Sequence, residues 1–335
     1  MPTDIPARDA GRDTGRETAV PRPAWQVLLI RPEVMTFLLL IAALVIASQL
    51  SEFFLDVDYI LRSFTLSAEF AIVALVLTMV IIAGEIDLSP AANMALSACL
   101  FAWAQASGWP FGLAIGAGLL AGLVMGLFNG FLVVVLQLPS IIVTIGTLIL
   151  FRGLAQVIAG DQSIRVPDWY IGIDRLFILG LPVPVVIFVV LALVLALVLG
   201  ATIFGRQIYL VGTNDVAARH AGVRSARVKM ILFGLLGLTA AVAGLMTASR
   251  LGSVRYDLGL GGELQMVLMA MLGGTYIFGG RGTILGTFLA AWLLVIVSTG
   301  MIVANWLPAW QLCVLGLLLI LSIIATNLIY SRTQR

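Results

Sequence analysis

The stretch FGRQIYLVGTNDVAARHAGVRSARVK, residues 204–229, is the only long polar segment inside an otherwise apolar chain. It holds five of the nineteen Lys and Arg residues and the only histidine. About six apolar segments precede it and about four follow it, so it divides a set of candidate membrane spans.

A short helix is predicted in the middle of this stretch. Asn214 is a favourable N-cap, and Asp215 lies in the first turn, where a carboxylate offsets the positive end of the helix dipole. Arg219 and His220 fall in the last turn, and Gly222 follows where a left-handed residue commonly ends a helix. A plain connection needs fewer residues. Two interpretations remain open: a basic loop that fixes orientation, or a docking element for a cytoplasmic partner.

The composition indicates an all-α polytopic membrane protein. Hydrophobic residues make up 61% of the chain and charged residues 11%, with a mean hydropathy of +1.10. A soluble domain carries about 25% charged residues. The net charge of +2, without a long basic run, gives no basis for nucleic-acid binding. Cys99 and Cys313 lie in apolar segments, so neither a disulfide framework nor a metal site is predicted.

The domain organisation follows from the distribution of charge. Residues 1–24 alternate acidic and basic residues and are predicted to form a disordered cytoplasmic tail, too charged for a signal peptide. Residues 25–330 are predicted to form a single transmembrane domain surrounded by membrane lipid, and 331–335 a second cytoplasmic tail.

Hydropathy predicts about ten transmembrane helices, each long enough to cross roughly 30 Å of hydrocarbon, near residues 34–51, 65–84, 90–107, 111–137, 140–160, 181–203, 230–249, 264–280, 283–303 and 311–330. The loop 204–229 then lies between spans six and seven. An even number of spans places both termini on one side. Basic residues near the span ends are more frequent on that side, so the termini and the loop 204–229 are predicted to be cytoplasmic.

The segment GEIDLSP, residues 84–90, is predicted to be a break between two spans. Glu85 and Asp87 are separated by two positions and cannot share one helical face. Ser89 before Pro90 marks a helix start, with a hydroxyl N-cap and a residue that needs no hydrogen-bond donor. The acids are either groups on a wet loop or groups that line a passage at membrane depth.

The next two spans carry small and polar residues. A ridge of glycines at every fourth position predicts close helix packing, at Gly118, Gly122, Gly126 and Gly130. Asn129 is a candidate for a hydrogen bond between helices, and Pro139 ends this span. Thr144 and Thr147 most often bond to their own helix backbone. Arg152 has to pair, reach the interface or face water, because an isolated charge in a membrane is costly.

Two outer loops, 161–175 and 250–263, concentrate charge. Their aromatic residues are predicted to anchor the chain at the membrane interface. Alternatively, the charges form a platform for an external binding protein, through Arg165, Asp168, Asp174, Arg250, Arg255 and Asp257.

The glycine-rich stretch LGGTYIFGGRGTILGT, residues 272–287, predicts close backbone contacts. It is not a P-loop, since such a loop needs GK[ST] and the only lysine, Lys229, is followed by methionine. His220 is the only histidine and lies outside the predicted spans, so no intramembrane serine–histidine pair is possible. The sequence also lacks HExxH, and no catalytic or zinc site is predicted.

Several of these motifs resemble the permease subunits of ribose- and galactose-type ABC sugar importers. The coupling segment FGR-x-IYxxGxNxxAAxxxG of that family is matched at Phe204-Gly205-Arg206, Ile208-Tyr209, Gly212, Asn214, Ala217-Ala218 and Gly222. A G-x-IDLS motif occurs at 84–89, FNG at 128–130, and TxGT with RG at 144–153. Arg250-Leu251, Glu263-Leu264 and the 279–286 glycines also fit. The resemblance covers most of residues 60–325.

The resemblance implies an ABC importer permease in a bacterial inner membrane. Its partners would be a second copy or a paralogue, two cytoplasmic ATPase subunits that hold ATP and Mg, and a periplasmic or extracellular sugar-binding protein. We assign ATPase coupling to Gly212, Asn214, Ala218, Arg219 and Gly222. We assign the translocation path to Glu85, Asp87, Ser89, Asn129, Thr144, Thr147 and Arg152, and binding-protein docking to Arg165, Asp168, Arg250, Arg255 and Asp257.

Glu85 stands where the family commonly has glycine, and Pro90-Ala91 replaces Val-Gly after the serine. These departures favour the rhamnose or autoinducer-2 branch over ribose. An ion-coupled secondary transporter that uses Glu85 and Asp87 remains an alternative, although the halves show no internal similarity. A scaffold or channel would leave the capped helix unexplained.

Overall fold

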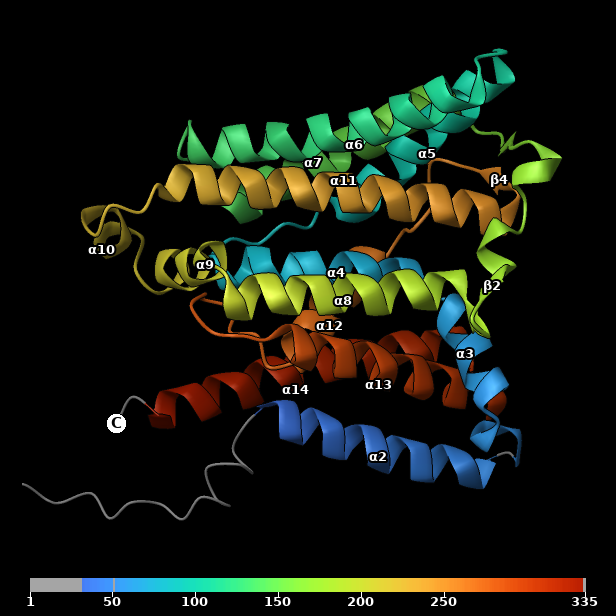
Figure 1. The fold of residues 1–335 in the computed structure, drawn as a ribbon. Coiled ribbons are helices and arrows are strands. Elements are labelled where there is room, and N and C mark those ends of the chain that lie inside the picture. The colour runs from blue at the N-terminus through green and yellow to red at the C-terminus, as the bar shows by residue number, and fades with distance from the viewer. Residues whose placement is uncertain (1–31, 51, 334–335) are drawn as a thin grey trace, which may run out of the picture.

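The computed structural model describes residues 32–50 and 52–333. Its α-helices are α2 Pro32–Leu50, α3 Val57–Thr65, α4 Ala68–Ile82, α5 Pro90–Ala106, α6 Phe111–Val134, α7 Ser140–Ala159, α8 Val183–Ala201, α9 Ile203–Thr213, α10 Asp215–His220, α11 Ser225–Leu251, α12 Gly262–Leu272, α13 Ile284–Val303 and α14 Pro308–Thr333. Most of the long helices run side by side (Figure 1). The all-α polytopic fold is confirmed. The predicted tail 1–24 lies outside the described residues.

The structure does not confirm the count of ten spans. Within the described part, seven helices are long and apolar enough to cross a membrane: α2, α6, α7, α8, α11, α13 and α14. Helices α3 and α4, bent by 70° relative to each other, form an eighth candidate. Helix α5 has only 17 residues and α12 only 11. Helices occur near all ten predicted positions, and seven or eight of these meet the length and composition expected of a membrane span.

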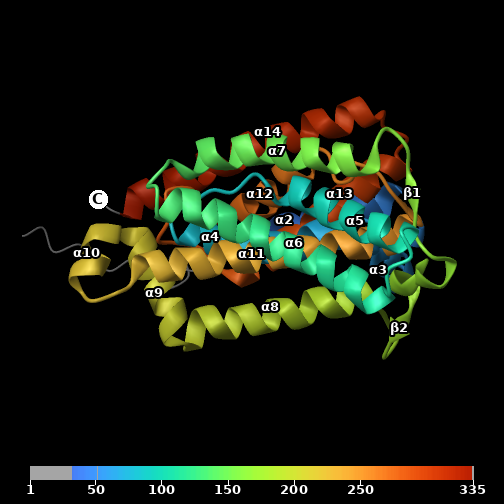
Figure 2. The ribbon, with the colours of Figure 1, turned by 90° about the horizontal axis from the view of Figure 1, so that it is seen from above.

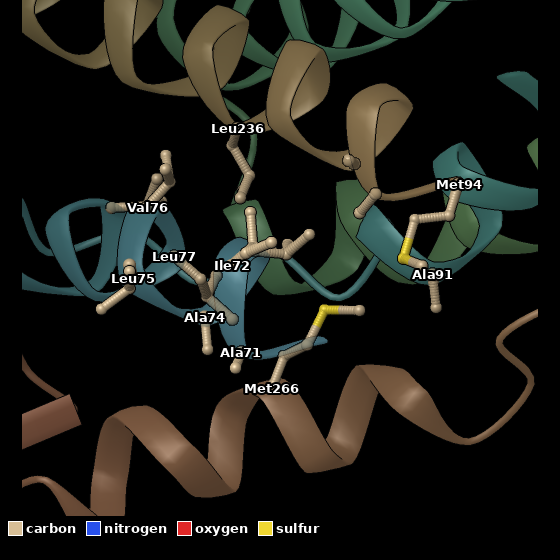
Figure 3. Close-up of a cluster of buried hydrophobic side chains, with 14 of the residues drawn as sticks. Ala71, Ile72, Ala74, Leu75, Val76, Leu77, Ala91, Met94, Leu236 and Met266 are labelled. Atoms are coloured by element: carbon tan, nitrogen blue, oxygen red, sulfur yellow. The ribbon is translucent and has the colours of Figure 1, made fainter. Parts of the chain in front are cut away.

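Helix α4 lies at the centre of the molecule. All but one of its residues are buried, as expected for a helix that is apolar on every side. Figure 3 shows this helix between α11, from which Leu236 points toward it, and α12, from which Met266 points toward it. The peripheral helices α2 and α14 instead leave most of their apolar side chains exposed, and lipid would cover them.

The glycine ridge of α6 packs against α11, as predicted. A Cβ atom added at Gly126 would lie 2.2 Å from the carbonyl oxygen of Phe233, and one at Gly122 would lie 2.7 Å from that of Gly237. These positions have no space for a side chain. The absence of side chains brings the two helix backbones into contact.

Short strands lie at the end of the molecule opposite α10 (Figure 1). Strand β1 (Ile164–Arg165) pairs antiparallel with β4 (Ser253–Val254) and thereby joins the two outer loops. Strands β2 (Phe177–Ile178) and β3 (Leu181–Pro182) form a hairpin before α8. The 3₁₀ helices η1 Glu52–Leu55, η2 Asp168–Tyr170 and η3 Ile173–Arg175 complete the connections.

Two boundaries differ from the sequence-based expectation. The helix predicted at 264–280 ends at Leu272, because the following turn contains Gly274, Gly279 and Gly280 with positive φ angles. The polar stretch 204–229 is mostly helical, since α9 and α11 extend into it from both sides. Helix α9 turns away from the direction of α8 and leads toward α10 (Figure 2).

Candidate coupling and translocation site

Helix α10 has the termini that the sequence predicts. The side chain of Asn214 accepts a hydrogen bond from the Ala217 N–H at 3.0 Å, so it is the N-cap. Gly222 has φ +83°, the left-handed conformation expected after the helix. Arg219 pairs with Asp215 one turn earlier, at 2.6 Å. The prediction of a short capped helix is therefore confirmed.

Two assigned coupling residues are not on the outer surface of α10. Ala218 is buried. Gly212 lies at the end of α9, where a Cβ atom would be only 1.7 Å from the Ile82 carbonyl oxygen. The same oxygen accepts a hydrogen bond from the Gly280 N–H at 2.8 Å. Gly212 thus allows the end of α4, the end of α9 and the glycine-rich turn to meet.

An ion-pair cluster lies beside α10. Lys229 Nζ is 2.7 Å from Glu85 Oε1 and 3.7 Å from Asp215 Oδ2. Burial raises the pKa of Asp215, but the Ser225 hydroxyl, the Lys229 ammonium and the Arg219 guanidinium outweigh it, so that pKa lies below its ordinary value. Asp215 is therefore ionised at neutral pH. The sequence did not link Lys229 to Glu85, because nothing local connects positions 144 residues apart.

A cavity of about 530 Å³ opens next to this cluster. It lies between the turn that joins α6 to α7 and the first turns of α10 and α11, and is lined by Glu85, Val133, Val134, Gln137, Leu138, Pro139, Ser140, Asp215, Arg219, Ser225, Ala226 and Lys229. Its lining mixes charged, polar and apolar side chains.

The break between α4 and α5 is non-helical from residue 85 to 89, as predicted. Ser89 occupies the N-cap position, but the predicted hydroxyl cap is wrong. Its Oγ accepts a hydrogen bond from Asn129 Nδ2 at 2.8 Å instead. Asp87 Oδ1 accepts from the Ser89 N–H at 2.7 Å, and Asp87 Oδ2 accepts from Asn129 at 3.4 Å. The three buried side chains connect the break to α6.

Side chains of helix α7 also form hydrogen bonds with the break between α4 and α5. Ser140 Oγ accepts a hydrogen bond from the Ile86 N–H at 3.2 Å, and Thr144 Oγ1 donates to the Ile86 carbonyl at 3.3 Å. Thr147 donates to the Thr144 carbonyl within its own helix, at 3.4 Å. The break is therefore fixed to both α6 and α7 by side chains of those helices.

Arg152 holds an outer segment of the chain. Its Nη1 donates to the carbonyl oxygens of Tyr256 at 2.9 Å and Leu258 at 2.6 Å. Its Nε and Nη2 atoms, and Oε2 of Glu263, are buried without hydrogen-bond partners. The guanidinium thus anchors the segment before α12.

The assigned docking charges form separate pairs. Arg165 pairs with Asp168 at 2.9 Å on the surface, and Arg255 pairs with Asp257. The hydrogen bond from Arg255 holds the pKa of Asp257 below its ordinary value. Arg250 pairs at 2.8 Å with Glu69, which is buried.

Glu69 was missed by sequence reasoning. The available signal was an acid in the first turn of a helix that is otherwise almost wholly apolar. Among residues 32–50 and 52–333, no group of three His, Cys, Asp or Glu residues could hold a metal ion.

Comparisons with known proteins place the chain in a family. The family described as "Branched-chain amino acid transport system / permease component" matches residues 59–323. The autoinducer 2 import system permease protein LsrD of Klebsiella pneumoniae is 35% identical over 270 residues, covering 78% of this chain and 81% of the relative. The ribose import permease protein RbsC of Bacillus subtilis is 35% identical over 291 residues, covering 86% and 90%. No solved structure matches the chain significantly. The chain therefore belongs to this family of membrane transport permease components.

Proposed function

We propose that the chain is the membrane-spanning permease of an ATP-driven importer for a monosaccharide or a related small polyol in the bacterial inner membrane. The observation that carries this proposal is α10, a capped helix at one end of a chain that matches a permease family along residues 59–323. Relatives that share 35% of aligned residues are named as ribose and autoinducer 2 import permeases. The family match gives no support to the ion-coupled alternative.

The chain would act without catalysis of its own. The sequence has no P-loop lysine, so ATP and Mg would bind to two partner ATPase subunits. Helix α10 would sit in a cleft on such a subunit, with Val216, 60% exposed, and Arg219 on the accessible side. A second permease, identical or paralogous, would complete the passage. Both termini and α10 would face the cytoplasm.

Transport would follow alternating access. ATP binding would draw the ATPase subunits together and move α10 with them. This motion shifts the permease only if α10 binds differently in the two ATPase states, because equal contact would favour neither. The break at 85–89, fixed to α6 and α7 by side chains, is the segment through which such a shift would reach the passage. A sugar-binding protein would deliver solute at the opposite end, where the outer loops with the paired strands β1 and β4 lie.

Reconstitution tests this proposal. The permease, its ATPase and its binding protein would be incorporated into vesicles and supplied with labelled ribose and, separately, autoinducer 2. We expect uptake to need ATP and to survive ionophores that collapse ion gradients. Uptake that persists without the ATPase, or stops with the ionophore alone, contradicts the proposal. Calorimetry of the binding protein against ribose, xylose, galactose, rhamnose and autoinducer 2 identifies the solute.

A pair of variants tests the role of α10 in the same vesicles. Gly222→Val places a β-branched residue at a positive φ angle, which costs about 1–2 kcal/mol or more, whereas Gly222→Asn is tolerated there. Open space around Gly222 excludes a steric clash as the cause. We expect the valine variant to insert normally but to lose ATP-driven uptake, and the asparagine variant to keep it. Equal uptake by both variants contradicts a coupling role for this turn.

A further inference from the structure

The ammonium of Lys229 connects three parts of the fold. It bonds to Glu85 in the break after α4, at 2.7 Å, and lies 3.7 Å from Asp215 in the first turn of α10, while Lys229 itself belongs to the start of α11. The side chains of Lys229 and Glu85 are only 15% and 13% exposed. Solvent screens such a pair less than it screens an exposed pair, so its loss is felt more strongly.

Glu85 is followed in the chain by residues that bond to α6 and α7. Its neighbour Ile86 is bonded to α7 through both backbone groups, and Asp87 is bonded to Asn129 on α6. A displacement of the Glu85 side chain therefore acts on a segment that α6 and α7 share. The preceding Gly84, with φ +86°, ends α4, and the Glu85 N–H bonds back to the Val80 carbonyl at 3.1 Å, so the segment that follows is linked to α4 as well.

Asp215 has two cationic partners, so it can lose one of them and remain paired with the other. Its Oδ2 atom accepts from Arg219 at 2.6 Å within α10 and lies 3.7 Å from Lys229. If α10 moves away, Asp215 keeps Arg219, because both belong to the same short helix. Glu85 has no such alternative: in the described part of the chain, Lys229 is the only cation that pairs with it. The cluster can thus exist in two arrangements without leaving an acid unpaired.

We propose that Lys229 is the positioning residue that transmits movement of α10 to the break at 85–89. In the arrangement seen here, Lys229 holds Glu85 and lies close to Asp215. When the ATPase moves α10, Lys229 separates from Asp215 but stays paired with Glu85, and the movement of this pair shifts the segment held by α6 and α7. This inference rests on the proposed ATP-driven function.

The chain itself provides a probe, because Lys229 is its only lysine. The complete complex in vesicles is treated with a small amine-reactive reagent, and the peptide containing Lys229 is quantified by mass spectrometry. An ammonium held between two carboxylates reacts slowly. We expect the reaction at Lys229 to be about fivefold faster in the ATP-trapped complex than without nucleotide. Equal rates in a complex that shows ATP-driven uptake overturn the proposal and leave the proposed function intact.

Variants supply an independent readout, the number of ATP molecules hydrolysed per solute imported. Lys229→Met keeps the length of the side chain without its charge, and Glu85→Gln removes the opposite charge. We expect each to raise this ratio by about fivefold, and the double variant to raise it no further. Lys229→Arg restores the cation and keeps the ratio near that of the unchanged protein. A merely stabilising ion pair would lower the yield of complex but leave the ratio unaltered.

Arg227→Gln is the matched control. Arg227 lies two residues from Lys229 at the start of α11, is exposed, and makes no ion pair within residues 32–50 and 52–333. We expect it to leave the ratio unchanged. A ratio that stays the same in Lys229→Met overturns the proposal. If Lys229→Met fails to assemble, the labelling rates of the unchanged complex still decide. Uptake that needs no ATP instead refutes the proposed function.

Discussion

Gly212 and Gly222 lie ten positions apart and are glycine for different reasons. Gly222 has open space around it but a positive φ angle, so the backbone conformation requires glycine. Gly212 has ordinary helical geometry at the end of α9, but the Ile82 carbonyl occupies the place of a side chain. Sequence motifs treat both as one coupling signature. In the structure, Gly222 ends a helix, whereas Gly212 allows a close packing contact.

Gly212→Ala is expected to destabilise the protein. The added methyl group has to displace the Ile82 carbonyl, which is 1.7 Å from its ideal position and bonded to the Gly280 N–H. Overpacking of this kind costs about 1–3 kcal/mol or more. Thermal unfolding of the purified permease in detergent measures the effect. Gly200→Ala, in α8 with nothing near its added atom, is the control and should leave the midpoint the same or raise it slightly. Equal midpoints for both variants contradict the close backbone contact.

At the scale of elements, α9 is a helix inside a stretch whose polar residues suggested a loop. Residues 204–213 were interpreted as part of a polar loop, yet they form a helix whose buried face carries Gly205, Ile208 and Val211. Their spacing of three residues is helical, and this is the signal that could have identified α9. Conversely, α12 was predicted too long, because the apolar stretch continues past the glycines that end it.

The packing of α6 on α11 predicts that two glycine-to-alanine substitutions in α6 change the unfolding midpoint in different ways. Gly126→Ala is expected to lower the unfolding midpoint, because its Cβ would approach the Phe233 carbonyl to 2.2 Å and force the helices apart. Gly116→Ala, nearly three turns earlier, meets open space and gains helix propensity of about 1 kcal/mol at most. Its midpoint should stay the same or rise. A similar loss in both variants would show that α11 does not pack on the glycine ridge.

At the scale of the whole molecule, the charged features separate to two ends. Helix α10 lies at one end, and the short strands lie at the other. Lys229 pairs with Glu85 and Asp215 beside α10, and Arg255 pairs with Asp257 just after β4. The apolar helices between the two ends therefore lie in the hydrocarbon, and the charged ends lie at the two membrane surfaces, because exposed backbone and charge are costly in hydrocarbon. Which end faces the cytoplasm is a prediction from the distribution of arginines.

Single cysteines test this orientation. In a Cys313→Ser background, Val216→Cys in α10 and Leu179→Cys between β2 and β3 introduce thiols at residues that are 60% and 99% exposed. The remaining Cys99 is buried. A membrane-impermeant maleimide added to intact cells or right-side-out vesicles should label residue 179 and not residue 216. Permeabilisation should expose both, which controls for reactivity. The reverse pattern would place α10 outside.

The sequence by itself determined the class of protein, the position of the apolar helices, the break at 84–90 and the caps of α10. These features depend on composition, hydrophobic periodicity and local backbone chemistry, all of which act over a few residues. Family resemblance added a transport function that the comparisons support. Local chemistry did not predict the partner of the Ser89 hydroxyl, which accepts a hydrogen bond from Asn129 instead of capping α5.

Only the tertiary structure decided which distant groups meet. It paired Lys229 with Glu85, Arg250 with Glu69, and the glycines of α6 with the backbone of α11. It also left the count of ten spans unconfirmed, since α5 has 17 residues and α12 only 11. Contacts between residues more than a hundred positions apart depend on how the helices pack. That packing minimises exposed polar groups across the whole chain, and no short stretch encodes it.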